Sequence, residues 1–283
     1  MHEEDRARGV AAVRSIASSL GLRVDDVIVL SDSNRLVLHL RRSDIVARAA
    51  SIAHFASSAL ELDLARQLAG YPIAGLDPRV APQVFVRDGF DITFWEHFKA
   101  VPTRKVPTAE YLGALEGLHA GLRRAAVDAP HVRDRIATTL EMVTTRDRTP
   151  DLADENRTLL ANTMRDRGAS IVASAVPEQL LHGEPHPWNL LDTNRGVKLI
   201  DFENTCVGPL EYDLAWVPDD VATRYPDVDR ALLADCRAVV LAIIAAHRWS
   251  HDDHHPSGRR SGHAFLDALR NGPPWPTLDQ ITW

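Results

Sequence analysis

Residues 180–214 read LLHGEPHPWNLLDTNRGVKLIDFENTCVGPLEYDL. Two short apolar runs in this stretch, 190–191 and 197–200, flank a polar turn at 192–196, and this pattern predicts a β-hairpin. A hairpin would bring Asn189 and Asp201 to the same end. Amide and carboxylate oxygens are ligands that Mg²⁺ accepts. The stretch therefore predicts a metal site at that end, with Glu184 five residues before Asn189 as a further carboxylate.

The spacing resembles that of protein kinases, in which an Asp stands five residues before a metal-binding Asn and an Asp-Phe-Gly follows. More specifically, the stretch resembles the catalytic core of the aminoglycoside phosphotransferase family, small-molecule kinases with a protein-kinase-like fold. That family's pattern is His-Gly-Asp-x-x-x-x-Asn, then Ile-Asp-Phe or Ile-Asp-Trp, then Gly-x-Pro and Tyr-Asp-Leu-Ala. The matching residues are His182-Gly183-Glu184, Asn189, Ile200-Asp201-Phe202, a contracted Gly208-Pro209 and Tyr212-Asp213-Leu214-Ala215. The strong part of the resemblance covers about an eighth of the chain.

This resemblance implies an α+β fold of the two-lobed protein-kinase-like type, with a small antiparallel-sheet N-lobe and a mainly helical C-lobe. Residues 1–98 would form the N-terminal nucleotide-binding lobe, and residues 99–283 the C-terminal helical lobe with the catalytic loop and the substrate site. The implied reaction moves the γ-phosphate of ATP or GTP, with Mg²⁺, to a hydroxyl of a small molecule. Glu184 would orient or deprotonate that hydroxyl, and Asn189 and Asp201 would hold the metal.

Short β-runs separated by turn residues predict the sheet of the first lobe, at 27–30, 36–40 and 45–49. Where a kinase has a lysine on the third strand, this chain offers Arg48, and the helix expected over about 54–69 presents Glu61. The planar fork of Arg48 can grip phosphate oxygens, but its geometry differs from that of a lysine. A surface arginine on an edge strand is the alternative.

Four further residues are candidates for nucleotide contact. Ser33 and Asn34 lie in the turn that would cover the phosphates, and an ordinary hairpin turn is the alternative interpretation. A second hairpin, over 84–87 and 92–98 with its turn at Asp88-Gly89, ends on Glu96 and Phe98. The resemblance puts these two at the hinge that meets adenine, through backbone groups.

Helical periodicity predicts further helices at about 10–20, from Thr108 as a cap, at 132–143 and at 151–167. Residues 231–249 are apolar on nearly every face and predict a buried helix. A last helix is expected over about 262–270.

The chain departs from the family pattern at several positions. Glu184 replaces Asp, and its one extra methylene moves the carboxylate by ~1.5 Å. A misplacement of about 1 Å can cost on the order of a hundredfold in rate, so this replacement would lower activity unless the loop compensates. Glu203 replaces the Gly of Asp-Phe-Gly, and Trp188 would either wall the substrate site or fill core space. A nucleotide-binding pseudokinase, acting as a sensor or scaffold, is therefore the alternative to an active enzyme.

The composition agrees with a globular protein. A net charge of −7 over 283 residues argues against a nucleic-acid footprint and suits a cationic acceptor, such as an amine sugar. Cys206 and Cys236 have no metal spacing. No signal-peptide pattern or membrane-length apolar run occurs, so we expect a cytoplasmic protein without a membrane partner.

Competing motifs are weaker. His182-x-Glu184 matches half of a zinc deaminase signature, but the required Pro-Cys-x-x-Cys is absent, as is a Walker A pattern. The histidines and aspartates of 247–255 indicate a solvated loop, with metal binding as the alternative. Acidic residues in the region of the family's substrate pocket would attract a cationic acceptor or form a solvated helix face: Glu211, Asp219, Asp220, Asp227, Asp229 and Asp235.

Overall fold

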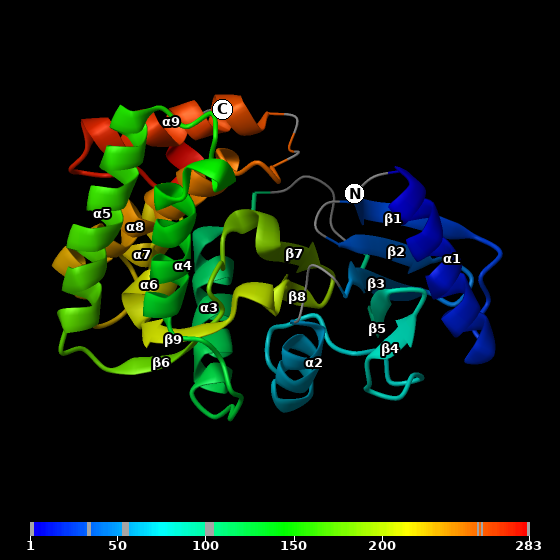
Figure 1. The fold of residues 1–283 in the computed structure, drawn as a ribbon. Coiled ribbons are helices and arrows are strands. Elements are labelled where there is room, and N and C mark those ends of the chain that lie inside the picture. Colours follow the sequence, from blue (N-terminus) through cyan, green and yellow to red (C-terminus); the bar gives the residue numbers. More distant parts are fainter. Residues whose placement is uncertain are drawn as a thin grey trace. The chain divides into compact units, whose positions relative to one another are not determined.

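The structure is a computed structural model that describes residues 3–32, 35–52, 57–99, 105–253, 255 and 257–281. Contacts divide the chain into two compact units (Figure 1). The first unit comprises Met1–Val106, Arg124–Asp128 and Leu190–Glu203, and the second comprises Pro107–Arg123, Ala129–Asn189 and Asn204–Trp283. A functional division into lobes at residues 98 and 99 stays a prediction.

The first unit contains an antiparallel sheet with strand order β1-β2-β3-β5-β4. Its strands are β1 (Val27–Asp32), β2 (Leu36–Leu40), β3 (Ile45–Ser51), β4 (Phe85–Arg87) and β5 (Phe90–Glu96). The predicted β-runs are therefore confirmed. The β4–β5 turn is also as predicted, because Asp88 and Gly89 both have positive φ, 51° and 85°, as a tight hairpin turn requires.

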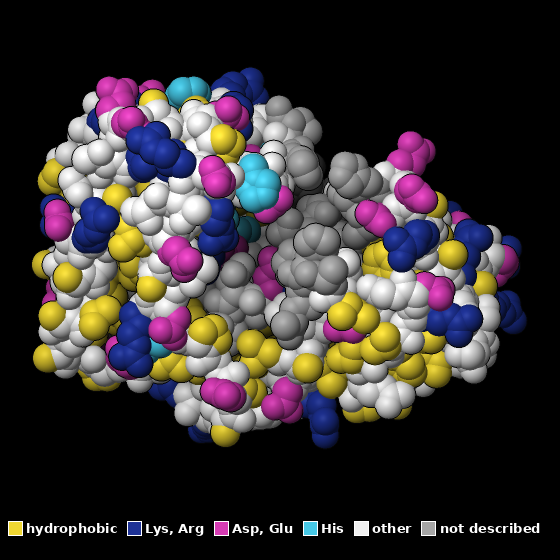
Figure 2. All heavy atoms as spheres, viewed as in Figure 1, with side chains coloured by type: hydrophobic (Ala, Val, Ile, Leu, Met, Phe, Trp, Pro, Cys, Tyr) yellow, Lys and Arg dark blue, Asp and Glu magenta, His cyan; other side chains and the backbone are white. Residues whose placement is uncertain are grey.

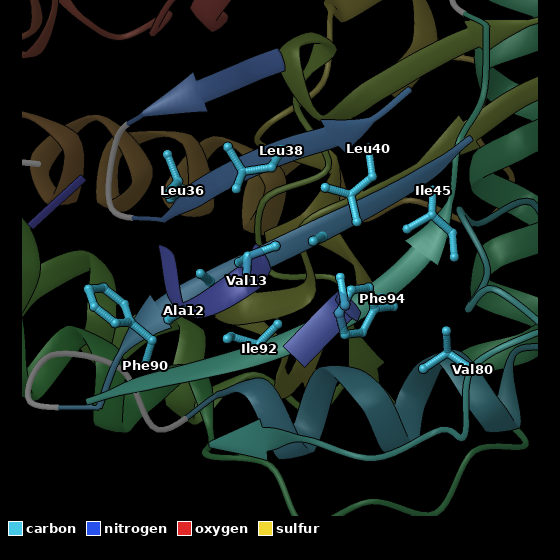
Figure 3. Packing of buried hydrophobic residues seen from close by; sticks show 13 residues of the cluster. Ala12, Val13, Leu36, Leu38, Leu40, Ile45, Val80, Phe90, Ile92 and Phe94 are labelled. Carbon is cyan, nitrogen blue, oxygen red and sulfur yellow. The ribbon is translucent and has the colours of Figure 1, made fainter. Parts of the chain in front are cut away.

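One face of this sheet is apolar and is covered by helix α1 (Glu3–Ser19). Alternate residues of each strand point the same way, so Leu36, Leu38 and Leu40 of β2 are all fully buried. Figure 3 shows these side chains packed with Ala12 and Val13 of α1 and with residues of β5. The intervening residues of each strand consequently face the other side of the sheet.

A hairpin of β7 (Leu190–Thr193) and β8 (Gly196–Leu199) also belongs to the first unit, as does helix α2 (Ser58–Gln67). The predicted hairpin is confirmed, with Leu190 paired to Leu199, so the chain enters and leaves it at one end. Backbone hydrogen bonds from Leu199 to Pro72 and from Ala74 to Leu199, of 2.8 and 3.0 Å, attach the hairpin to the segment after α2.

The second unit is mainly helical. Its longer helices are α3 (Thr108–Leu122), α4 (Val132–Thr144), α5 (Asp154–Ala173), α8 (Arg230–Arg248) and α9 (Gly258–Asn271). Its shorter elements are α6 (Leu210–Leu214), α7 (Asp219–Ala222) and the strand pair β6 (Glu178–Leu181) and β9 (Cys206–Pro209). Its described residues also form 3-10 turns at Arg146–Arg148, Pro187–Asn189 and Leu278–Gln280. A further 3-10 turn, Phe202–Asn204, starts in the first unit and ends on the first residue of the second unit's last segment. Helices α4, α5 and α9 pack against α8, which confirms the predicted buried helix (Figure 1).

One local expectation needs correction, and one strand pair was not predicted. Thr108 is the first residue of α3 and not its cap, because Pro107 takes the N-cap position with an extended ψ of 141°. The hydroxyl of Thr108 donates instead to Asp220. Strands β6 and β9 were not predicted, since each has four residues and their pairing joins segments far apart in the sequence.

The surface mixes charges of both signs. On the face drawn in Figure 2, acidic and basic side chains are interspersed with hydrophobic ones, so the net charge of −7 is not concentrated in one part of that face. Among the described residues, no helix is both long enough and apolar enough to cross a bilayer.

Candidate active site

Arg48 of β3 lies on the sheet face opposite α1, because its neighbours Ala47 and Ala49 point into the apolar core. Its Nη1 bonds Oε2 of Glu61 at 2.6 Å, and its Nη2 bonds Oδ1 of Asp201 at 2.7 Å. The structure therefore brings three of the candidate site residues together within the first unit. Asp201, in the left-handed region with φ of 70°, is 35 % exposed, and Glu61 is fully buried.

A second arginine completes this cluster. Nη1 of Arg35 forms an ion pair with Oε1 of Glu61 at 2.5 Å, and its Nη2 lies 3.1 Å from Oε2 of Glu203. Glu61 thus bridges two guanidinium groups, one on each carboxylate oxygen. We call Arg35, Arg48, Glu61, Asp201 and Glu203 the arginine–carboxylate network. Carboxylate oxygens of its three acidic members lie within 4.8 Å of one another, close enough to share a cation.

Arg35 was missed by sequence reasoning. It follows a turn as a single basic residue, and nothing in the local pattern distinguishes it from a surface arginine. Glu203 was identified only as a departure from Asp-Phe-Gly, and its contact with Arg35 gives it an ionic role. Burial would lower the pKa of Arg48, but the carboxylates of Glu61 and Asp201 raise it above its usual value. Arg48 is therefore permanently charged.

We expect Arg48→Lys to lower the free energy of unfolding by about 1–2 kcal/mol, since one ammonium cannot reproduce a fork that holds two carboxylates. Urea unfolding measures this change. The matched control is Arg41→Lys, whose pair with Asp26 at 3.4 Å is solvent-exposed. That control should change stability by less than about 0.5 kcal/mol. Equal losses in the two variants would contradict the role given to Arg48.

In the second unit, Asp213 organises the loop before Glu184. Its carboxylate, fully buried, accepts hydrogen bonds from the backbone N–H groups of His182 and Gly183, at 2.9 and 2.8 Å. It also lies 3.0 Å from Nε2 of the buried His119. Asp213 therefore ties this loop together by hydrogen bonds. His182 has a structural role, because its Nδ1 accepts a hydrogen bond of 3.3 Å from the backbone N–H of Glu184.

Gly183 is required by the same loop. It has φ of 90°, and a Cβ at this position would stand 1.9 Å from the backbone oxygen of Asn204. We expect Gly183→Ala to lower the free energy of unfolding by about 2–3 kcal/mol, because strain and collision act together. Gly113→Ala is the control, because a Cβ on this exposed position of α3 meets nothing within 4 Å. That control should raise stability by about 0.5–1 kcal/mol, so a thermal-unfolding comparison in which both variants lose stability equally would contradict the argument.

Glu184 is held by Arg135 of α4, a partner that sequence reasoning did not find. Nη2 of Arg135 bonds Oε1 of Glu184, and Nη1 approaches the backbone oxygen of Gly183 at 3.4 Å. The same guanidinium stacks over the ring of Trp216, 5.5 Å from its centroid. Burial opposes the charge of Arg135, but neighbouring groups, Glu184 among them, raise its pKa overall. Its helical position alone carried no signal.

Asn189 lies in the same unit as Glu184. Its Nδ2 donates to the backbone oxygen of Glu184 at 3.0 Å, and its backbone N–H donates to His186 at 2.9 Å. Both bonds fix the 3-10 turn Pro187–Asn189, which precedes β7. Trp188 of this turn is 58 % exposed, so the core-filling interpretation of it is wrong.

The remaining candidates for nucleotide contact are Ser33, Asn34, Glu96 and Phe98. Ser33 and Asn34 lie outside the described residues. Glu96 lies 3.9 Å from Arg195, whose guanidinium stands over the ring of Phe98. Their contact with adenine stays a prediction.

The acidic residues near the expected substrate pocket have partners within their own unit. Asp229 caps α8 through Ala231 and Leu232, and its N–H donates to the buried Glu211. Asp219 pairs with Arg237, and Asp235 with Arg167. These contacts favour a structural role for the four acidic residues involved.

A family model described as the Phosphotransferase enzyme family matches residues 28–249. The chain belongs to this family. The match covers more than half of the sequence and includes every candidate site residue. Membership places the chain among small-molecule phosphotransferases. No curated protein matches the sequence.

Solved structures show which fold this phosphotransferase has. An amicoumacin kinase, hAmiN, in complex with AMP-PNP, Ca²⁺ and Ami, matches with a TM-score of 0.67 at 15% identity, over 98% of each chain. Choline kinase LicA from Streptococcus pneumoniae matches with a TM-score of 0.65 at 13% identity, over 92% of this chain and 98% of that one. The aminoglycoside phosphotransferase APH(4)-Ia, as a thermostable mutant in its apo form, matches with a TM-score of 0.63 at 14% identity, over 90% and 97%. The protein-kinase-like α+β fold, with a small antiparallel sheet and a mainly helical second part, is therefore confirmed.

Proposed function

We propose that this chain transfers the γ-phosphate of ATP or GTP to a hydroxyl of a small molecule in the cytoplasm, with Mg²⁺. The observation that carries the proposal is the order and spacing of Glu184, Asn189 and Asp201 inside the segment that the family model matches. In kinases, an Asn and an Asp supply the oxygen ligands that hold the metal, and a carboxylate, there an Asp, orients the attacking hydroxyl.

The arginine–carboxylate network supports nucleotide binding by the first unit. Two N–H groups of Arg48 are engaged by Glu61 and Asp201, and a guanidinium has further donors that can contact phosphate oxygens. Because Glu61 also holds Arg35, the position of Arg48 is fixed before nucleotide arrives. A preorganised cation of this kind stabilises charge that develops on a transferring phosphoryl group.

The side-chain oxygens of Asn189 and Asp201 fit Mg²⁺, which prefers oxygen ligands. The amide nitrogen of Asn189 is turned toward the backbone oxygen of Glu184, so its amide oxygen points away from that bond. Asp201 keeps a second carboxylate oxygen beside the one bonded to Arg48. When bound, Mg²⁺ would neutralise phosphate charge during transfer.

Glu184 would orient the acceptor hydroxyl. Arg135 binds Oε1 of Glu184, and Oε2, which lies 3.9 Å from Nε2 of His186, can accept a hydrogen bond from the substrate. Because the transition state of phosphoryl transfer is loose, orientation matters more than full proton removal. The contact with Arg135 would compensate for the extra methylene of Glu184 by fixing where the carboxylate lies.

We propose a cationic, amine-bearing alcohol as the acceptor class. The net charge of −7 would attract such a molecule. Two of the similar structures carry compatible names, one a choline kinase and another a complex with GDP and kanamycin. An aminoglycoside-like amine sugar belongs to this class.

A nucleotide-binding pseudokinase is the second candidate. The observation that favours it is that both proposed catalytic carboxylates are engaged by arginines, Glu184 by Arg135 and Asp201 by Arg48. A carboxylate that an arginine already holds is less free to orient a hydroxyl or to bind a metal ion. In this case the chain would bind nucleotide as a sensor without turnover.

The deciding experiment measures transfer from radiolabelled ATP and GTP, with Mg²⁺, to a panel of aminoglycosides, choline-like amines and neutral alcohols. Labelled product that requires Mg²⁺ supports the enzyme. Nucleotide binding that is unchanged in Glu184→Gln and Asp201→Asn, together with no product in the parent, would support the pseudokinase. Product from neutral alcohols alone would overturn the proposed acceptor class.

A further inference from the structure

Three side chains of the first unit converge at the end of its sheet. His39 belongs to β2, Asp44 lies in the turn between β2 and β3, and His97 directly follows β5. Oδ1 of Asp44 is 3.1 Å from Nε2 of His39 and 2.8 Å from Nδ1 of His97. The two imidazole rings stack with centroids 3.6 Å apart and an interplanar angle of 13°. One carboxylate oxygen therefore serves two rings.

The fold places these residues for identifiable reasons. His39 alternates with the buried Leu38 and Leu40, so it faces the side of the sheet opposite α1. Asp44 has φ of 51°, which turns the chain between β2 and β3 and directs the carboxylate toward both rings. The histidine side chains are mostly buried, 12 % and 21 % exposed, while Asp44 is open to solvent at 70 %. A small ion can reach this cluster from the Asp44 side.

Two imidazole nitrogens and one carboxylate oxygen are a donor set that suits Zn²⁺ and similar transition-metal ions better than Mg²⁺. One ligand atom from each residue lies within 4.8 Å of the others. Ligands bound at about 2.0–2.2 Å around a tetrahedral ion stand roughly 3.3 Å apart, so the two hydrogen bonds need to lengthen by only a few tenths of an ångström. The rings must also turn out of their stack to aim both nitrogens at one point.

The charges nearby permit such an ion. Arg79 is the adjacent cation, and its Nη2 approaches the backbone oxygen of Asp44 at 3.3 Å. Its own charge is compensated by Asp77, which it contacts at 2.6 Å. The cation that would oppose metal binding is thus already paired.

A hydrogen-bonded His–Asp cluster without an ion is the simpler account. The chain offers a comparison in His251, whose Nε2 lies 3.1 Å from Asp252 on the surface of the second unit. That pair has one ring and one carboxylate, whereas at Asp44 two rings from different strands meet a single oxygen. Each imidazole donates a hydrogen bond to the Asp44 carboxylate only when its facing nitrogen carries the proton. The same nitrogen can bind a metal ion when the proton lies on the other ring nitrogen, so each ring needs only a change of tautomer.

We propose that His39, Asp44 and His97 form a binding site for a divalent transition-metal ion, distinct from the Mg²⁺ that phosphoryl transfer would use. The three protein ligands leave a fourth position for water, as in open zinc sites. Because His97 lies between Glu96 and Phe98, a bound ion would fix the backbone where β5 ends. This site does not depend on the proposed function.

Equilibrium dialysis of the untagged full chain against Zn²⁺, with excess Mg²⁺ and no nucleotide, tests the proposal. The parent should bind one Zn²⁺ that His39→Gln, His97→Gln and Asp44→Asn each weaken by about tenfold or more. The matched control, His251→Gln, should bind as the parent does. Zn²⁺ should also raise the melting temperature of the parent more than that of the three variants.

The result that overturns the proposal is a parent that binds no Zn²⁺, or binding that the three variants leave unchanged. If a histidine variant fails to fold, Asp44→Asn still tests the proposal. This variant should fold, because asparagine tolerates a positive φ and the position is exposed. If only this variant folds and it binds Zn²⁺ as tightly as the parent, the proposal is wrong. Loss of binding in His251→Gln would also overturn it.

Discussion

Replacing Asp201 with asparagine should lower kcat by on the order of a thousandfold, the largest effect that we expect from a single substitution in this chain. The substitution keeps the shape of the side chain but removes the negative charge that pairs with Arg48 at 2.7 Å and that would hold the cation. Steady-state rates at saturating Mg²⁺, with the acceptor identified by the transfer panel, measure the change.

Nucleotide affinity provides a second measurement of the same variant. We expect Mg²⁺ to strengthen ATP binding by the parent and to have little effect on Asp201→Asn. Asp63→Asn is the matched control, because Asp63 is an exposed carboxylate of α2, two residues from Glu61 and outside the arginine–carboxylate network. A rate for Asp201→Asn above about a tenth of the parent's would contradict a metal-binding role for Asp201.

Glu184→Gln should lower kcat by about a hundredfold, at the low end of the range for a general base because the transition state is loose. The free energy of unfolding should fall by about 1–3 kcal/mol as well, since Arg135 loses a charged partner in a mostly buried place. Transfer rates and urea unfolding of the same preparation separate the two effects.

Glu184→Asp distinguishes position from charge. It restores the residue of the family pattern, yet the shorter side chain would no longer reach Arg135, so we expect a rate at least about tenfold below the parent's. Glu178→Gln is the control, because Glu178 is a hydrogen-bonded glutamate of the same unit whose partner is Nε2 of His131 at 2.9 Å. A rate for Glu184→Asp equal to or above that of the parent would show that Arg135 is not needed to position the carboxylate.

Much of the fold could be predicted because its signals are local. Alternation in Leu36, Leu38 and Leu40 predicts a strand with one buried face, and Asp88-Gly89 predicts a tight turn; both are confirmed. The pairing of β6 with β9 could not be predicted, since a four-residue segment is too short to show a period and the two strands lie far apart in the sequence. Thr108 was misassigned because a capping residue and a first helical residue look alike beside a proline.

The residues of the candidate site that belong to a sequence motif could be predicted, whereas those that join it through contacts in the folded chain could not. Glu184, Asn189 and Asp201 were found by their spacing, and their roles stay predictions. Arg35 and Arg135 were missed, because each acts through a partner 26 or 49 residues away in sequence, and an arginine on a strand or helix is usually a surface residue. Only the folded chain identifies which arginines face a carboxylate.

The arginine–carboxylate network also constrains how this sequence can evolve. Arg35 contacts both Glu61 and Glu203, so a change of Glu203 to the glycine of Asp-Phe-Gly removes one of its two acidic partners. Residues in contact within one ionic network show coupling energies of about 0.5–3 kcal/mol, so substitutions at positions 35 and 203 should be strongly epistatic. A lineage that reaches the common motif would have to exchange Arg35 and Glu203 together, or pass through a less stable intermediate sequence.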